Sequence, residues 1–167
     1  IPELDAGAEA IIVTASGCAV ELRDYGELLR DDPAYAERAA RGAAACRDLS
    51  EFLAGEDLAA LAPPSRGRRR VAWHSPCTLQ HGQRIVGTVE RILDELGFER
   101  VPVADAHLCC GSAGTYSILQ PELANELRAR KVRALTAAAP ERVVTANVGC
   151  QLHLAGGTGT PVTHWIE

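Results

Sequence analysis

The sequence predicts an α/β fold, a Rossmann-like parallel sheet with flanking helices. Two observations lead to this prediction: short, largely apolar runs recur along the chain, and from residue 70 onward they alternate with helical patterns. Runs of this kind are typical of parallel strands buried on both faces, which are connected by right-handed crossovers. The expected strands are residues 9–14, 70–74, 99–103, 142–146 and 161–165.

Helical patterns fill the segments between these strands. Residues 83–96 carry their apolar side chains on one helical face and are followed by Gly97, a common helix stop. Residues 121–138 begin with Pro121, which is favoured in a first helical turn. A third helix is expected over residues 33–54, and a short one is expected before the last strand.

Two segments of the chain resemble each other. EAIIVTASGCAVEL at 9–22 and ERVVTANVGCQLHL at 141–154 each combine a charged residue, an apolar strand, Gly-Cys and a helical pattern. This similarity indicates two related domains. We therefore expect residues 1–64 to be the C-terminal portion of a first domain with its connecting helix, and residues 65–167 to be the second domain. The chain, which contains no methionine, is expected to be a fragment of a longer protein.

Composition excludes several classes of protein. The net charge of −5 gives no electrostatic basis for nucleic-acid binding, and no apolar stretch reaches the roughly 20 residues of a membrane-spanning helix. Six cysteines are many for a cytosolic core, yet the chain is too large for a secreted disulfide scaffold and shows no signal-peptide pattern. The cysteines are therefore expected to serve metal, cluster or redox chemistry in a reducing compartment.

Four of the six cysteines follow the ends of three predicted strands. Cys77 comes after strand 70–74, the adjacent pair Cys109 and Cys110 after strand 99–103, and Cys150 after strand 142–146. Because the carboxyl ends of parallel strands form one crevice, these loops are expected to bring the four thiols together.

The other two cysteines call for different interpretations. Cys46 lies in an Ala-rich helical segment and is expected to be an ordinary buried core residue. Cys18 follows Gly17 in the first of the two similar segments and is expected to bind metal in the site of that first domain.

Four thiolates can hold either a zinc ion or an iron–sulfur cluster. The chain has no Cys-x-x-Cys pair of the kind that structural zinc sites favour, and the sulfurs of adjacent Cys109 and Cys110 can reach two different metal atoms. This pattern favours a multinuclear iron–sulfur site over zinc. A redox disulfide between the two neighbours is disfavoured by strain. Gly111 and Gly114 permit positive φ, which would turn backbone amides toward sulfur.

Several polar residues lie close to these cysteines. His153, three residues after Cys150, could be a metal ligand or an ordinary helix residue, and Asn147 could cap a helix or line the crevice beside Gly149. The histidines that flank the other cysteines could donate hydrogen bonds to a bound cluster, and none of them is assigned as a ligand. These histidines are His74, His81 and His107.

The cysteine motifs resemble a known family. HSPCTLQH, HLCCGSAGTYS and TANVGCQLHL are similar to the cysteine-rich CCG domain shared by heterodisulfide reductases and related oxidoreductases. Together with VTHWIE and TASGC…DYGELL, they are nearer still to the iron–sulfur subunits of bacterial glycolate oxidases. The resemblance covers essentially the whole chain.

The resemblance implies an electron-transfer subunit in the cytoplasm, free or associated peripherally with the inner face of the plasma membrane. Its partners would be FAD-containing glycolate oxidase subunits and an N-terminal ferredoxin-like region of the same chain. The family's noncubane 4Fe–4S cluster implies Cys77, Cys109, Cys110 and Cys150 as ligands, with His153 at the fifth position. The alternatives are a lactate-utilisation or heterodisulfide-reductase-like iron–sulfur subunit and a zinc-stabilised interaction module.

Overall fold

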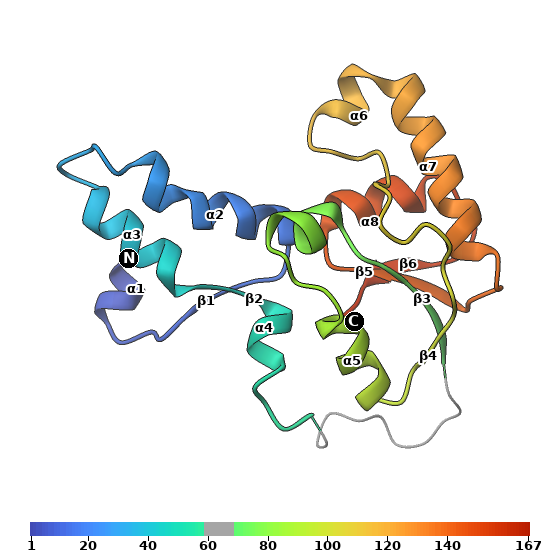
Figure 1. The fold of residues 1–167 in the computed structure, drawn as a ribbon, viewed down its shortest axis with the longest axis horizontal. Helices are drawn as coiled ribbons and strands as arrows, with labels where there is room; N and C mark the ends of the chain where they lie inside the picture. The colour runs from blue at the N-terminus through green and yellow to red at the C-terminus, as the bar shows by residue number, and fades with distance from the viewer. Residues whose placement is uncertain (59–68) are drawn as a thin grey trace.

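The computed structural model describes residues 1–58 and 69–167 and has the α/β architecture that the sequence predicts (Figure 1). From Arg70 onward strands and helices alternate as expected. The proposed boundary between residues 64 and 65 lies outside the described residues, so the division into two domains stays a prediction. No helix within the described ranges is long and apolar enough to cross a membrane.

The larger sheet contains four parallel strands in the order β4-β3-β5-β6. The central strands are β3 (Arg70–His74) and β5 (Arg142–Thr145), which pair from Val71 opposite Arg142 to His74 opposite Thr145. The edge strands are β4 (Glu99–Arg100) and β6 (Val162–His164). All four begin near the positions that the apolar runs predict, and β4 is shorter than expected.

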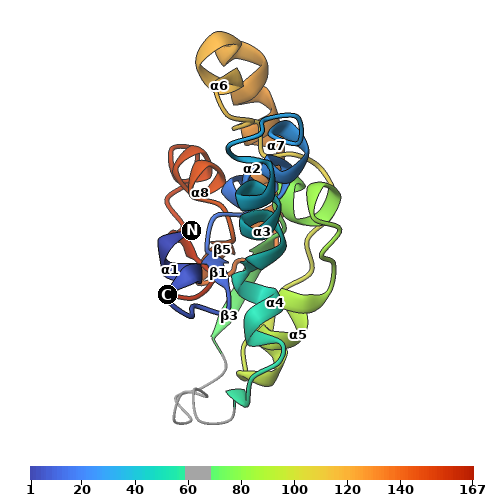
Figure 2. The same ribbon diagram turned by 90° about the vertical axis from the view of Figure 1, so that its left-hand side faces the viewer.

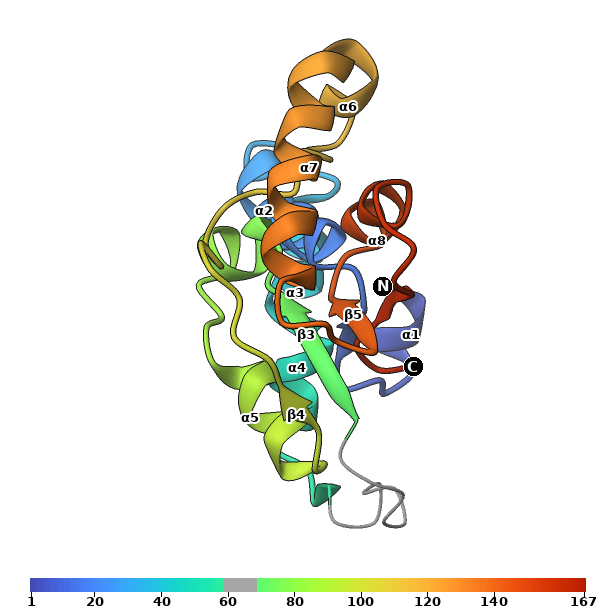
Figure 3. The same ribbon diagram turned by 90° about the vertical axis from the view of Figure 1, so that its right-hand side faces the viewer.

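Helices cover both faces of this sheet. On one face α5 (Thr88–Glu95) and the neighbouring α4 (Leu49–Leu53) pack against the strands, and on the other α7 (Pro121–Thr136) and α8 (Val148–Ala155) do so (Figure 3). The short helix α6 (Tyr116–Leu119) precedes α7.

The side chains of β3 divide between these two faces, because successive residues of a strand point to opposite sides. Val71 and Trp73 pack into the core beneath α5. Ala72 packs on the opposite face with Cys110 and Cys150, and alternation places His74 on that face as well. One strand therefore contributes to the core and to the cysteine-rich side.

The N-terminal part of the chain forms a second, smaller layer (Figure 2). Here α1 (Pro2–Asp5) precedes β1 (Ile11–Val13), which pairs in parallel with β2 (Cys46–Asp48). The helices α2 (Ser16–Leu28) and α3 (Ala36–Ala45) pack against each other beside this pair.

The single helix predicted over residues 33–54 is wrong, because the chain forms α3, β2 and α4 in that interval. The Ala-rich run is a strong helix former and hides the break. The sequence does carry a signal for it: Asp48 and Glu51 have the spacing of a capping box, and in the structure they form one at the start of α4. Cys46 is buried as expected, but it lies in β2 and not in a helix.

The helix predicted over residues 83–96 begins only at Thr88. A π-helical turn, Thr78–Gly82, precedes it, and the Ile85 amide donates to the Leu79 carbonyl at 3.0 Å. The Gln83 amide likewise donates to the Thr78 carbonyl at 3.0 Å, and Gly87, with a φ of 80°, is the N-cap at which α5 begins.

Hydrogen bonds to two backbone carbonyls join the small layer to the large sheet. The Ser16 amide at the start of α2 donates to the Ala146 carbonyl after β5 at 3.0 Å. His164 Nε2 lies 2.8 Å from the Thr14 carbonyl. The two similar strand–Gly-Cys–helix segments therefore meet at their turns, where the side chains of Ser16 and Thr78 also share a hydrogen bond of 2.8 Å.

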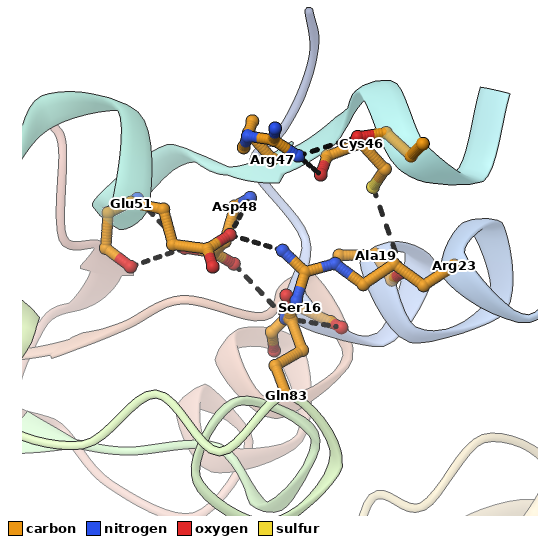
Figure 4. Close-up of polar contacts among 10 residues, drawn as sticks. Ser16, Ala19, Arg23, Cys46, Arg47, Asp48, Glu51 and Gln83 are labelled. Carbon is orange, nitrogen blue, oxygen red and sulfur yellow. Dashed lines mark hydrogen bonds and ion pairs between the residues drawn. The ribbon is translucent and has the colours of Figure 1, made fainter. Parts of the chain in front are cut away.

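Asp48 is the centre of a polar network next to this junction (Figure 4). Its buried carboxylate accepts hydrogen bonds from the Ser50 amide at 2.9 Å, the Ser50 hydroxyl at 2.6 Å and Gln83 Nε2 at 3.3 Å. The Gln83 side chain also donates to the Ser16 carbonyl at 3.2 Å, and Arg23 pairs with Glu51. Asp48 therefore links α4, the π-helical turn and α2.

Replacing Asp48 with alanine is expected to lower the free energy of unfolding by about 2 kcal/mol, because the α4 cap and the partners of Ser50 and Gln83 are lost together. Urea unfolding followed by circular dichroism would measure the loss. Asp24→Ala, on the exposed surface of α2, is the control and should change stability by less than about 0.5 kcal/mol. Equal effects of the two substitutions would show that the network does not stabilise the fold.

Candidate metal centre

The structure brings together the four cysteines that follow strands of the large sheet. Cys77 lies in the turn after β3, Cys109 and Cys110 lie between β4 and α6, and Cys150 lies in the first turn of α8. Hydrogen bonds link Cys77 to Cys109, Cys109 to Cys110, and Cys110 to Cys150. The sequence prediction placed Cys150 in a loop, whereas the helix begins two residues before it.

Along the row of four thiols, the pKa is raised and lowered in turn. Hydrogen bonds from Cys110 and Cys77 lower the pKa of Cys109, and a hydrogen bond from Cys110 lowers the pKa of Cys150 to about 5. Hydrogen bonding to these neighbours, together with burial, raises the pKa of Cys77 and Cys110. Ionising all four requires a positive group among them, because like charges this close repel.

Backbone amides turn toward the sulfurs. The Gly111 amide donates to Cys109 Sγ at 3.3 Å, and the Ser112 amide donates to Cys110. Gly111 has a φ of 94° and Gly114 a φ of 60°, which confirms that this loop uses positive φ at both glycines. A Cβ atom at Gly111 would lie 2.5 Å from the Ala124 carbonyl oxygen. The loop is therefore closely packed on α7.

Asn147 and Gly149 position the helix that carries Cys150. Asn147 caps α8, because its Oδ1 accepts a hydrogen bond from the Gly149 amide at 2.9 Å. Its Nδ2 donates to Ser16 Oγ at 3.3 Å and to Thr78 Oγ1 at 3.4 Å, so both ends of the amide have protein partners. A Cβ at Gly149 would lie 3.1 Å from Ser112 Oγ, so glycine permits the close approach of α8 to the Cys109–Cys110 loop.

A buried lysine on α7 holds the same loop from the other side. Lys131 is 3% exposed, and its Nζ donates to the carbonyl oxygens of Asp105 at 3.0 Å and Ala106 at 2.9 Å. Burial lowers the pKa of Lys131, while negative charge on Cys110 would raise it. A cavity of about 180 Å³ opens here between Cys109 and α7. The sequence offers little signal for this role, since Lys131 looks like an exposed helix residue.

Two predicted ligands lie outside this group. Cys18 is exposed on α2, and no hydrogen bond within the described part of the chain joins it to another cysteine. His153 lies on α8, but its Nε2 lies 3.2 Å from the Ala124 carbonyl of α7 and thus hydrogen-bonds there. His81 lies on the exposed side, with Nε2 3.5 Å from the His107 carbonyl.

His74, which the sequence left without a specific role, lies within the cysteine group. It ends β3 with 1% of its surface exposed, and among the described residues neither ring nitrogen has a nitrogen or oxygen partner. It lies beside Cys150, whose pKa a hydrogen bond with His74 helps to lower. One ring nitrogen and the sulfurs of Cys110 and Cys150 all lie within 4.8 Å of one another. The signal in the sequence is its position, a histidine at the carboxyl end of an apolar strand and three residues before Cys77.

The donor set suits a soft metal or an iron–sulfur cluster. Four thiols that contact one another in a row, with amides directed at the sulfurs of Cys109 and Cys110, provide the ligands and the hydrogen bonds that such groups require. A ring nitrogen of buried His74, within 4.8 Å of the sulfurs of Cys110 and Cys150, adds a further donor atom. Cys77 and Cys109 remain half-buried, so the group lies at the protein surface and not in a closed core.

Comparison with known proteins agrees with this geometry. The chain is 50% identical over 166 residues to the glycolate oxidase iron–sulfur subunit of Escherichia coli (strain K12), covering 99% of this chain and 40% of that protein. It is 30% identical over 162 residues to lactate utilization protein A of Geobacillus thermodenitrificans (strain NG80-2), covering 92% of this chain and 64% of that protein. It thus spans less than two thirds of either relative.

The cysteine-rich domain model CCG matches residues 71–155, the interval that contains the four clustered cysteines, Gly111 and Gly114. This match covers just over half of the chain. The chain therefore belongs to the cysteine-rich CCG domain family.

Proposed function

We propose that this chain binds an iron–sulfur cluster and transfers electrons as part of an oxidoreductase that acts on glycolate. The observation that carries the proposal is the contact of Cys77, Cys109, Cys110 and Cys150, which come from three segments at one edge of the sheet. The site suits zinc less well than an iron–sulfur cluster, because Cys109 and Cys110 are adjacent and the sequence contains no Cys-x-x-Cys pair.

The residues of the chain supply binding and access. The thiolates hold the cluster, a 4Fe–4S cluster of the noncubane type in the family, and Lys131 and the loop amides offset their negative charge. When bound, the cluster supplies one-electron transfer. Half-buried Cys77 and Cys109, and the cavity beside Cys109, leave this side open to a redox partner.

The glycolate substrate follows from the relative with 50% identity, which is named as a glycolate oxidase subunit. By this proposal an FAD-containing partner subunit oxidises the substrate, and a ferredoxin-like region of the same chain continues the electron path. Residues 1–64 would complete a first CCG domain that uses Cys18, and the protein would work in the cytoplasm or at the inner face of the plasma membrane. Lactate is the second candidate substrate, since several relatives are named lactate utilization protein A.

Metal analysis tests the proposal. The protein, purified without oxygen at the full length that its gene encodes, is compared with its Cys150→Ser variant for iron, inorganic sulfide and zinc. The wild type is expected to hold about four more irons and four more sulfides per chain than the variant. A difference in zinc alone, with equal iron in the two proteins, would overturn the proposal and favour a zinc-stabilised interaction module.

A further inference from the structure

We propose that His74 is a direct nitrogen ligand of the metal group held by the four cysteines. This inference rests on the proposed function and assigns one more residue to the same site. It concerns the fifth ligand position, for which the resemblance offers His153.

The first argument is burial without a nitrogen or oxygen partner. His74 is 1% exposed, and among the described residues neither Nδ1 nor Nε2 has a nitrogen or oxygen partner. The polar group beside it is the Cys150 thiol, whose pKa a hydrogen bond with His74 helps to lower. Native proteins rarely leave a buried polar group without a nitrogen or oxygen partner, and such a group calls for a ligand or ion that satisfies it. Its cross-strand neighbour Thr145, fully buried, also has an unpartnered hydroxyl. His74 and Thr145 are the paired last residues of β3 and β5, whereas Trp73, whose indole nitrogen is also unpartnered, packs on the opposite face.

The second argument is the direction in which the His74 side chain points. Strand alternation places His74 on the face of the sheet where Ala72 packs with Cys110 and Cys150. The ligand atoms of His74, Cys110 and Cys150 all lie within 4.8 Å of one another, and among the described residues no other such group of three or more was found. Two ligands of one metal, each about 2.0 to 2.3 Å from it, lie no more than about 4.6 Å apart, so small movements suffice for binding.

The third argument is that His153 is occupied elsewhere. Its Nε2 hydrogen-bonds with the Ala124 carbonyl of α7, 3.2 Å away. The same nitrogen would lie 3.2 Å from a Cβ at Gly111, so the imidazole fills the space behind the loop. His153 thus braces α8 against α7, whereas the polar group beside His74 is Cys150, itself one of the proposed ligands.

A histidine ligand has an electronic consequence. A neutral imidazole replaces a thiolate, which removes one negative charge from the ligand set and raises the reduction potential of a cluster. We therefore expect a higher potential than the same site would have with a cysteine at position 74.

The experiment compares His74→Ala, His74→Cys and, as the matched control, His153→Ala, each in the full-length protein purified without oxygen. Iron content is measured, and pulsed EPR of the reduced protein labelled with ¹⁵N-histidine reports any nitrogen bound to iron. The wild type and His153→Ala should show a strongly coupled histidine nitrogen. In His74→Ala this signal should vanish, and in His74→Cys the iron should be retained with a lower reduction potential and no nitrogen signal.

The outcomes separate this inference from the proposed function. Wild-type protein with no more iron than its Cys150→Ser variant would overturn the proposed function. A nitrogen signal that persists in iron-containing His74→Ala protein, or that disappears in His153→Ala protein, would overturn the assignment of His74 and leave the cluster in place.

Discussion

The Cys109→Ser variant is expected to lose all of the iron of this site and the visible absorption that depends on it. Cys109 is central in the chain of sulfurs, since it contacts both Cys77 and Cys110 and accepts the hydrogen bond of the Gly111 amide. A serine hydroxyl is a poor ligand for a soft metal and ionises far less readily than a thiol. Iron analysis and absorption spectra of the full-length protein, prepared without oxygen, would measure the loss.

Cys46→Ser is the control for this prediction. Cys46 undergoes the same chemical change and is as deeply buried as Cys110, but it lies in β2, where its thiol donates to the Ala19 carbonyl at 3.9 Å. The control should keep the full iron content. If the two variants lost iron equally, the effect would come from general destabilisation and the assignment of Cys109 would fail.

Replacing Gly111 with alanine is expected to lower the free energy of unfolding by about 3 kcal/mol or more. Two costs add at this position. A φ of 94° is unfavourable for alanine by roughly 1 to 2 kcal/mol, and the new methyl group would lie 2.5 Å from the Ala124 carbonyl oxygen and 3.0 Å from Leu127 Cβ. Because both neighbours belong to α7, relief of the clash must move the loop or the helix.

Gly114→Ala separates the two costs. Gly114 also has a positive φ, 60°, but no atom lies within 4 Å of the position where its Cβ would be built. Alanine there should cost only about 1 kcal/mol. Denaturant unfolding of both variants measures the difference. A loss at position 111 no greater than that at 114 would show that the loop can withdraw from α7 at little cost.

The large sheet could be predicted from the sequence, because its strands are short apolar runs that can be recognised without knowledge of the tertiary contacts. The convergence of the four cysteines could be predicted as well, since the carboxyl ends of parallel strands lie at one edge of the sheet. The prediction fails at β2, where the Ala-rich segment ending at Ala45 favours a helix and only pairing with β1 makes Cys46–Asp48 a strand. Local propensity is overridden by tertiary contact there.

The contributions of single side chains to the site are less predictable. His74 and His153 look equally suitable as ligands in the sequence, and only the packing of α8 on α7 gives His153 a different partner. The role of Lys131 is equally hard to predict, because burial of a lysine depends on which face of α7 packs against the loop at Asp105. Such differences arise from the way that helices pack and not from any motif.

The alternation of β3 has a consequence for the insertions and deletions that this chain can tolerate. A substitution in the strand changes one face of the sheet. A deletion of one residue before Trp73 would instead turn each following side chain of the strand to the opposite face. The Trp73 indole would then point toward Cys110 and Cys150, and the His74 imidazole would enter the apolar core beneath α5. The length of the strand, as much as its composition, therefore specifies the site.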